Sequence, residues 1–162
     1  MSPSKINLGG GKYKVPGFLN IDSISYPEVD IVADLSKGIP LEDNSVEEVM
    51  AYSVLEHLDN TVGIMEEIYR VCKNGAKVDI IVPYFKTTGA FQDPTHKRFF
   101  TEKTFQYFDK KNKRYDFKCD FKVKRIEYKY VTTGYKLYIL KYFKRFIWDV
   151  IKTMRVELEV IK

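Results

Sequence analysis

The first half of the sequence contains a series of short apolar runs, each bounded by turn-forming residues, and this series restricts the fold more than any other feature. Most of the runs are continuously apolar rather than alternating, which is typical of parallel strands covered on both faces of a sheet. They predict an α/β domain with a parallel sheet. The runs are Lys5–Leu8, Phe18–Ile21, Val29–Ala33, Val46–Tyr52 and Val78–Val82.

One amphipathic helix is expected between the fourth and fifth runs. It begins after Asn60 and Thr61, which are N-cap candidates, and Gly75 ends it. A second, shorter helix is predicted after Thr101, where Phe105 and Phe108 lie three residues apart. The apolar stripe of the first helix consists of Val62, Met65, Ile68, Tyr69 and Cys72.

The second half of the chain follows a different pattern. From Tyr115 apolar and polar residues alternate, which predicts a long strand. The phase slips by one residue at Ile126, so we expect a β-bulge near Lys124 and Arg125. A helix is then expected over residues 135–153, and an alternating strand over residues 155–161 closes the chain.

Length and composition point to an ordinary folded protein. A chain of 162 residues fits one domain, and 44% hydrophobic with 30% charged residues argues against a disordered or fibrous chain. Cys72 and Cys119 have no partner spacing, so the sequence suggests neither a disulfide nor a metal site. Because no apolar leader precedes the first run, we expect a cytoplasmic protein.

The charges are distributed unevenly along the chain. Residues 1–95 hold 8 Lys/Arg and 14 Asp/Glu, a net charge of −6, whereas residues 96–162 hold 19 and 8, a net charge of +11. A basic half is able to attract nucleic acid, anionic lipid or a phosphorylated substrate. The alternative is a solvated, lysine-rich surface without a partner.

The first run ends in the glycine loop Gly9–Gly11, where missing side chains let the backbone approach a ligand closely. A dinucleotide-binding fingerprint would need a further glycine in place of Lys14 and a helix before Phe18. A phosphate-binding P-loop would need Gly-Lys-Ser/Thr, which this loop does not contain. The loop therefore argues against both classes of nucleotide-binding protein.

Polar residues end the next three runs, at the sheet edge where open parallel sheets bind ligands. Asp22 suits the two hydroxyls of a ribose, because a carboxylate accepts several hydrogen bonds. Asp34 and Leu35 together suit an adenine, which offers an amine donor and an apolar ring face. The block Ser53-Val54-Leu55-Glu56-His57 follows the fourth run.

In this order the blocks resemble the class I, S-adenosylmethionine-dependent methyltransferases, in particular the methyltransferase type 11-like group that includes quinone-biosynthesis enzymes. The resemblance covers roughly residues 5–108, including the tract Glu66–Lys77. It implies a Rossmann-like, mostly parallel seven-stranded sheet with an antiparallel C-terminal strand. It also implies S-adenosylmethionine as cofactor and S-adenosylhomocysteine as product. The cofactor-binding residues that it implies are Asn7, Gly9, Gly10, Gly11, Asp22, Asp34, Leu35, Ser53, Glu56 and His57.

We expect a single methyltransferase domain, residues 1–162, which the change in net charge divides into a cofactor-binding half (1–95) and a basic substrate or cap half (96–162). The chain departs from the family at Asn7, where many members carry an acid, and at Tyr13, where a third glycine often stands. The segments after the first two strands are too short for full helices. Because an uncovered apolar sheet face needs a partner, we expect a homodimer or cover from the helix at residues 137–151.

The segment Tyr84–Phe100 follows the fifth run, where this fold commonly builds its acceptor pocket. Methyl transfer from a sulfonium is an in-line displacement that depends mainly on positioning, and it needs a base only for hydroxyl or protonated amine acceptors. We predict His96 as that base and Asp93 as a second catalytic residue. The alternative is an ordinary surface turn at Asp93-Pro94.

The acceptor is expected to be a small molecule, anionic or linked to a glycan or lipid, and nucleic acid is disfavoured. The block that amino-methylating enzymes of adenine share is missing after the fourth run. Three alternatives stay open. A basic tract at 110–129 with aromatic rings suits an RNA methyltransferase, residues 135–153 suit an interfacial membrane helix, and Asn7 suits a non-catalytic module that only binds S-adenosylmethionine.

Overall fold

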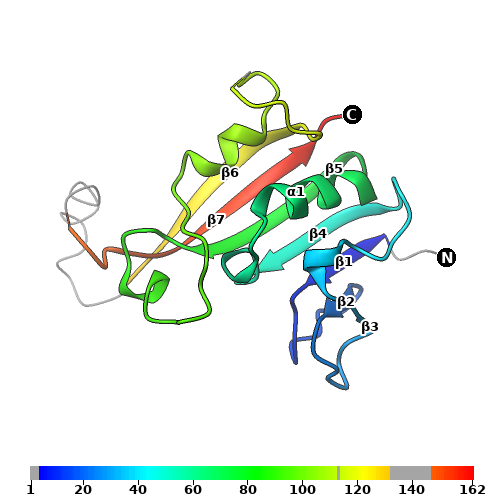
Figure 1. The fold of residues 1–162 in the computed structure, drawn as a ribbon, viewed down its shortest axis with the longest axis horizontal. Coiled ribbons are helices and arrows are strands. Elements are labelled where there is room, and N and C mark those ends of the chain that lie inside the picture. The colour runs from blue at the N-terminus through cyan, green and yellow to red at the C-terminus, as the bar shows by residue number, and fades with distance from the viewer. Residues whose placement is uncertain (1–3, 113, 132–146) are drawn as a thin grey trace.

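The structure of the protein is a computed structural model, which describes residues 4–112, 114–131 and 147–162. Within these residues the strands form one seven-stranded sheet, ordered β3-β2-β1-β4-β5-β7-β6 (Figure 1). The strands are β1 (Lys5–Leu8), β2 (Leu19–Asp22), β3 (Ile31–Val32), β4 (Val46–Tyr52), β5 (Cys72–Pro83), β6 (Phe121–Tyr130) and β7 (Ile151–Val160).

The directions of the strands agree with the predicted sheet. β1 is parallel to its neighbours β2 and β4, β2 is parallel to β3, and β4 is parallel to β5. β7 is antiparallel to both of its neighbours, β5 and β6. The expectation of a mostly parallel, Rossmann-like sheet with an antiparallel C-terminal strand is therefore confirmed.

The helix α1 (Thr61–Val71) lies between β4 and β5 in the chain and packs its apolar stripe on the sheet. Its N-terminus is capped as predicted, because the Asn60 side chain accepts a hydrogen bond from the Gly63 amide at 2.9 Å. The helix ends before Gly75, and Cys72 is the first residue of β5. The helical residues buried in the core are Ile64, Met65, Ile68 and Val71.

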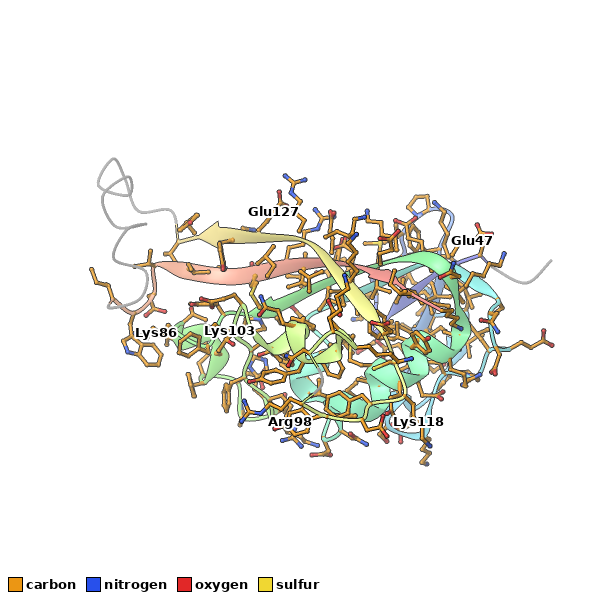
Figure 2. All side chains as sticks on the ribbon, turned by 90° about the horizontal axis from the view of Figure 1, so that it is seen from above. Glu47, Lys86, Arg98, Lys103, Lys118 and Glu127 are labelled. Atoms are coloured by element: carbon orange, nitrogen blue, oxygen red, sulfur yellow. The ribbon has the colours of Figure 1, made fainter. Side chains whose placement is uncertain are left out.

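In the part of the chain that the structure describes, four 3-10 turns lie between the strands: η1 (Leu35–Lys37), η2 (Leu55–His57), η3 (Thr88–Ala90) and η4 (Thr104–Phe108). The short helix predicted after Thr101 is thus present as η4, and its Phe105 and Phe108 are buried. The helices after strands one and two are missing in the described residues, as predicted. α1 and the segment between β5 and β6 all lie against one face of the sheet (Figures 1 and 2).

The opposite face of the sheet is open in the described part of the chain, and it is polar. Figure 2 shows Glu127 on this side, away from Arg98 and Lys118. A row of paired charged residues crosses four neighbouring strands: Lys5 on β1, Glu48 on β4, Lys77 on β5 and Glu159 on β7. Lys5 and Lys77 both pair with Glu48, with N–O distances of 2.9 and 3.7 Å. The apolar face from which we expected a partner is therefore not found among the described residues.

The charges on this open face include one that is almost completely buried. Asp79 is 2% exposed, and its carboxylate accepts hydrogen bonds from Arg155 Nε at 2.8 Å and from Tyr52 Oη at 2.7 Å. Burial alone would raise the pKa of Asp79, but the hydrogen bonds from Arg155 and Tyr52 hold that pKa below its ordinary value. Burial and the bond to Asp79 raise the pKa of Tyr52 to about 12.

Two predicted elements differ from the structure. The long strand expected from Tyr115 begins only at Phe121, because β7 ends at Val160, opposite Phe121, and leaves no neighbour for the preceding residues. Those residues pack as a loop instead, with Phe117 5.3 Å from the ring of Phe108 and Cys119 buried. Their alternation therefore reflects burial beneath a loop.

The helix predicted over residues 135–153 lies mostly outside the described residues. Where it is described, the prediction is wrong: residues 147–150 form a turn and β7 begins at Ile151. Asp149 in this turn has a φ of 56° and accepts a hydrogen bond from the Thr88 amide at 2.6 Å. This contact fixes the turn, so that the following residues pair with β5 rather than continue a helix.

The β-bulge predicted near Lys124 and Arg125 is confirmed by a register shift between Val123 and Arg125 in the pairing of β6 with β7. The shift moves the alternating pattern by one residue, so that Ile126 and Tyr128 face the core after the bulge. Among the described residues, no helix has the length and apolar character needed to cross a membrane.

Candidate functional site

The glycine loop at the carboxyl end of β1 favours glycine at each of its three positions. Gly9 and Gly11 have φ values of 63° and 51°, in the left-handed region. A Cβ atom on Gly10 would lie 1.9 Å from Oδ1 of Asn20 and 2.2 Å from Nδ2 of Asn7. The loop is therefore tightly packed against the residues beneath it, while its backbone lies at the sheet edge.

Two asparagines beneath the loop hold its shape. Asn7 is 5% exposed, and its amide nitrogen donates to Tyr13 O at 3.3 Å and to Asn20 Oδ1 at 3.1 Å. Asn20 is fully buried and donates to Gly11 O at 3.0 Å and to Glu28 O at 3.1 Å. The structure thus places Asn7 as a support for the loop. Sequence reasoning missed Asn20, although a single amide within an apolar run was a signal.

Asp22, predicted to bind a ribose, ends β2 beside the glycine loop. Its Oδ2 accepts from the Gly11 amide at 2.8 Å and its Oδ1 from the Ile24 amide at 2.9 Å. A carboxylate offers about four lone-pair positions, so roughly two stay free for ligand hydroxyls. The structure therefore brings Asp22 and the glycine loop together, as predicted.

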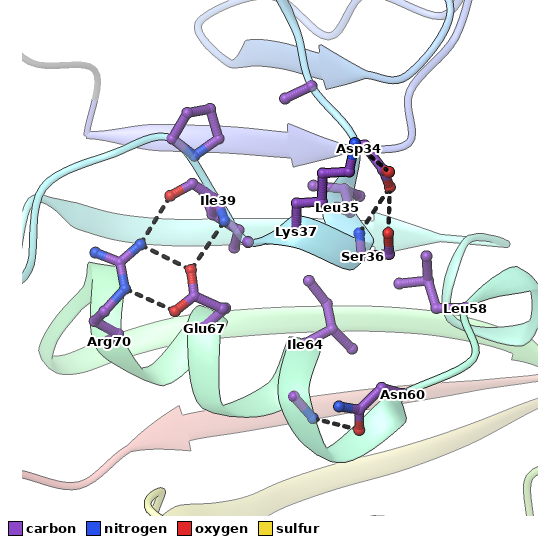
Figure 3. Close-up of a pocket in the computed structure, with 14 residues that line it drawn as sticks. Asp34, Leu35, Ser36, Lys37, Ile39, Leu58, Asn60, Ile64, Glu67 and Arg70 are labelled. Atoms are coloured by element: carbon purple, nitrogen blue, oxygen red, sulfur yellow. Dashed lines mark hydrogen bonds and ion pairs between the residues drawn. The ribbon is translucent and has the colours of Figure 1, made fainter.

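Asp34 and Leu35, predicted to contact an adenine, line a cavity of about 520 Å³ between η1 and α1 (Figure 3). This volume lies within the usual range for small-molecule sites. Asp34 caps η1 by accepting from the Ser36 amide at 3.0 Å, and the hydroxyl and amide of Ser36 lower the pKa of Asp34. The glycine loop, Asp22 and the histidines do not line this cavity.

Arg70 on α1 holds the far wall of this cavity. Its guanidinium donates to Glu67, to Ile39 O at 2.8 Å and to Leu41 O at 2.9 Å, as Figure 3 shows for Glu67 and Ile39. Glu67 in turn accepts from the Ile39 amide at 2.9 Å. These bonds tie the loop after η1 to α1, and sequence reasoning did not single out Arg70 or Glu67.

Ser53 and Glu56 lie where β4 ends. Ser53 has a φ of 53°, a conformation that costs free energy in a residue with a side chain and that is common at functional sites. The side chain of Val54 fills the space beside Gly9, which explains why no Cβ fits there. Glu56 follows on η2 and is 1% exposed. Burial raises the pKa of the Glu56 carboxyl above its ordinary value.

The histidine block of η2 meets the loop after β5. The ring centroids of His57 and His96 are 4.7 Å apart, and His96 Nε2 lies 3.9 Å from Asp93 Oδ2. The amides of Lys97 and Arg98 both donate to the Glu56 carbonyl, at 2.7 and 3.1 Å. The predicted catalytic residues His96 and Asp93 thus lie beside His57, which was predicted to bind the cofactor.

Three exposed aromatic rings stand beside this loop. Phe91 and Phe99 stack with centroids 4.4 Å apart, and Trp148 lies 5.8 Å from Phe91. The turn before β7 is linked to the loop by Asp149, which accepts a hydrogen bond from Thr87 Oγ1 at 3.0 Å. The loop after β5 therefore offers apolar surface near the two histidines.

The sheet order, its antiparallel β7 and the ligand-type residues at its carboxyl edge define the Rossmann-like methyltransferase fold. Residues 14–80 match the sequence model of the family described as "Methyltransferase domain". The chain therefore shares its fold with S-adenosylmethionine-dependent methyltransferases, and its first half is similar in sequence to a methyltransferase domain. No curated protein matches it in sequence.

Solved structures share the fold over almost the whole chain. A putative methyltransferase from Bacillus halodurans has a TM-score of 0.66 at 13% identity, with 97% of this chain and 92% of that one covered. A possible histamine N-methyltransferase from Thermotoga maritima has a TM-score of 0.64 at 14% identity, with 98% of this chain and 81% of that one covered. A putative methyltransferase solved in complex with the Trm112 methyltransferase activator of Haloferax volcanii has a TM-score of 0.63 at 12% identity, with 99% of this chain and 84% of that one covered.

Proposed function

We propose that this protein transfers a methyl group from S-adenosylmethionine to a small-molecule acceptor. One observation carries the proposal: ligand-type residues end four adjacent strands at the same sheet edge. Gly9–Gly11 follow β1, Asp22 ends β2, Asp34 follows β3 and Ser53 follows β4. Open α/β sheets bind their ligands at this edge.

Each of these groups suits one part of the cofactor. The backbone of the glycine loop would contact the methionine end, the free lone pairs of Asp22 the ribose hydroxyls, and Asp34 with Leu35 the adenine. Ser53, Glu56 and His57 would close the pocket from β4. Asn7 would act through the loop, because its amide nitrogen already serves Tyr13 and Asn20.

The acceptor would bind between the histidines and the aromatic rings of Phe91, Phe99 and Trp148. These rings are about half exposed, which favours an acceptor with an apolar or aromatic part. Where the acceptor is a hydroxyl or a protonated amine, His96 would accept its proton, with Asp93 beside it. An anionic, glycan-linked or lipid-linked acceptor is compatible with the basic half of the chain.

Calorimetry tests the cofactor half of the proposal. S-adenosylhomocysteine is expected to bind and NAD is not, because no helix after β1 is available to receive a pyrophosphate in the described residues. Asp22→Asn should weaken binding by about tenfold, since hydrogen bonds to a charged acceptor contribute roughly 1.5–3 kcal/mol. Binding of NAD alone would contradict the proposal.

Methyl-labelled S-adenosylmethionine tests the transfer half. It is incubated with panels of small amines, phenols and carboxylic acids, and with bulk RNA. Label in a small molecule supports the proposal, whereas label only in RNA assigns the enzyme to the alternative class. Cofactor binding without transfer to any acceptor would support the non-catalytic module instead. Full turnover in His96→Ala would remove His96 from the proposed catalytic residues.

A further inference from the structure

A buried carboxylate without a partner lies at the centre of the histidine block. Glu56 is 1% exposed, and neither of its carboxylate oxygens has a hydrogen-bond partner among the described residues. One potential ligand atom each of Glu56, His57 and His96 lies within 4.8 Å of the other two. An unpartnered buried carboxylate is costly, so its position beside two imidazoles calls for a cation.

The hydrogen bonds around the two imidazoles determine which ring nitrogens are free. His96 Nδ1 lies 3.0 Å from the Ala90 carbonyl, which only accepts, so Nδ1 carries the proton. Thr95 Oγ1 donates to Asp93 at 2.7 Å and must therefore accept the proton of His57 Nδ1 at 2.9 Å. In both neutral rings Nε2 keeps a free lone pair.

Three acceptor groups thus lie close together with no donor assigned to them: the Glu56 carboxylate and Nε2 of both histidines. This arrangement is the one that metal-binding histidines show, in which the second ring nitrogen donates to a carbonyl or to another polar group. The loop after β5 is also held in place, because the Glu56 carbonyl accepts the Lys97 and Arg98 amides. The site is therefore held by its surroundings on both sides.

We propose that Glu56, His57 and His96 bind a divalent first-row transition-metal ion such as Zn²⁺. Two imidazoles and one carboxylate are a common ligand set for such ions, whereas Mg²⁺ and Ca²⁺ take mainly oxygen ligands. Ligands bound at about 2.0–2.2 Å in a tetrahedral site lie roughly 3.4 Å apart, so side-chain rotations that bring the three atoms about 1 Å closer would place them on one ion. No motif in the sequence indicates this site, because its ligands come from two separate loops.

The three residues leave at least one coordination position for water or for an oxygen atom of the acceptor. In the metal-bound protein His96 Nε2 is a ligand and is not available as a base. An acceptor oxygen bound to the ion would lose its proton more readily, because a bound cation lowers the pKa of its oxygen ligands. Binding of the metal itself does not depend on the proposed methyl transfer.

Cobalt binding tests the proposal directly. Full-length, tag-free protein is treated with a chelator and titrated with Co²⁺, which reports nitrogen and oxygen ligands by its visible absorption. One Co²⁺ per chain, displaced by Zn²⁺ and not by Mg²⁺ or Ca²⁺, is expected. Absorption bands of a cobalt–thiolate bond would overturn the assignment, since they would place the ion at a cysteine.

Substitutions identify the ligands. Glu56→Gln keeps the shape of the side chain and should weaken Zn²⁺ binding by more than about tenfold. Thr95→Val removes the hydroxyl that links His57 to Asp93 and should cause a loss near tenfold. Asp59→Asn is the matched control, because its exposed carboxylate pairs with Lys97 outside the cluster, and it should bind Zn²⁺ like the wild type. Equal binding by Glu56→Gln and the control would refute the site.

Histidine NMR gives a readout that does not require a variant. The chain has only two histidines, so the imidazole ¹⁵N spectrum reports on this cluster alone. We expect both rings to carry their proton on Nδ1 without metal, and both Nε2 signals to shift with Zn²⁺. The proposal would be overturned by rings that are doubly protonated at pH 7 and whose ¹⁵N signals do not change when Zn²⁺ is added. Metal binding without methyl transfer would contradict only the proposed function.

Discussion

Gly10 shows how closely single residues determine the shape of the proposed cofactor site. The loop Gly9–Gly11 is packed on Asn7 and Asn20, which occupy the space that any side chain at position 10 would need. The sequence predicted a loop that approaches a ligand, and the structure adds that two buried amides lie directly beneath it. The loop is thus a rigid element, since its backbone has little room to adjust.

Replacing Gly10 with alanine should weaken binding of S-adenosylhomocysteine. The new Cβ atom would lie 1.9 Å from Asn20 Oδ1, so the loop must shift toward the ligand. Calorimetry measures the effect, with a loss of more than about tenfold expected, the equivalent of roughly 1.4 kcal/mol. Gly89→Ala is the control, because a Cβ there meets only Thr87, at 3.8 Å. Unchanged affinity in Gly10→Ala would show that the loop does not contact the ligand.

Asp79 illustrates a residue whose effect on stability depends on pH. Its folded-state pKa lies below the ordinary value of 3.8, so its ionised form stabilises the fold above that value, and the contribution is lost as the pH falls through the folded pKa. Asp79→Asn should lower the free energy of unfolding by about 1–2 kcal/mol at neutral pH, because Arg155, whose side chain is partly exposed, loses its charged partner.

Urea denaturation at several pH values measures this difference between wild type and Asp79→Asn. The difference should be constant from about pH 7 to pH 5 and should shrink below about pH 4. Glu47→Gln is the control, since Glu47 pairs with Lys73 at an exposed position and should change stability by less than about 1 kcal/mol. A difference that grows in acid would contradict a lowered folded-state pKa of Asp79.

Among the elements, α1 connects the core to the ligand cavity. Its apolar side packs on the sheet, and its last turn carries Arg70, which holds the loop after η1 through two carbonyls and the carboxylate of Asp43. Arg70 also pairs with Glu67 on the same helix. The helical stripe was visible in the sequence because it has a regular period. The role of Arg70 was not visible in the sequence, because its partners Ile39, Leu41 and Asp43 lie in an irregular loop.

Arg70→Met should loosen the wall of the cavity without breaking the helix. The substitution keeps the apolar stem and removes the hydrogen bonds, so a loss of about 2 kcal/mol in unfolding free energy is expected. Affinity for S-adenosylhomocysteine should also fall, since η1 carries Leu35 and follows Asp34. Lys73→Met, an exposed residue just beyond α1, is the comparison. Loss of stability with unchanged affinity would separate this cavity from the cofactor site.

At the scale of the whole molecule, the open sheet face distinguishes this chain. The segments after β1 and β2 are too short for helices, so in the described residues one face of the sheet is uncovered. It is occupied by charges paired across strands, such as Lys5 with Glu48 and Lys124 with Glu159. A charged face is stable in contact with water and needs no partner to cover it. The homodimer expected from the sequence stays a proposal, and its interface would have to lie on a different surface.

Light scattering tests whether the open face takes part in self-association. Glu157→Lys reverses a charge on β7 beside Asp79 and Arg125 on that face. The measured mass of the variant should equal that of the wild type, whether the protein is a monomer or a dimer. A dimer that dissociates on this substitution would show that the open face is the interface.

The sequence by itself determined the strands of the parallel half, the capped helix and the order of ligand-type residues, because periodicity, caps and strand ends are local properties. β1 and β4 agree with the prediction residue for residue. Tertiary structure decided what depends on distant partners: the late start of β6, the turn at Asp149 and the pairing of Asp79 with Arg155. It also brought Glu56 to His96. Such contacts follow from how strands and loops pack in space, and no pattern within one segment records them.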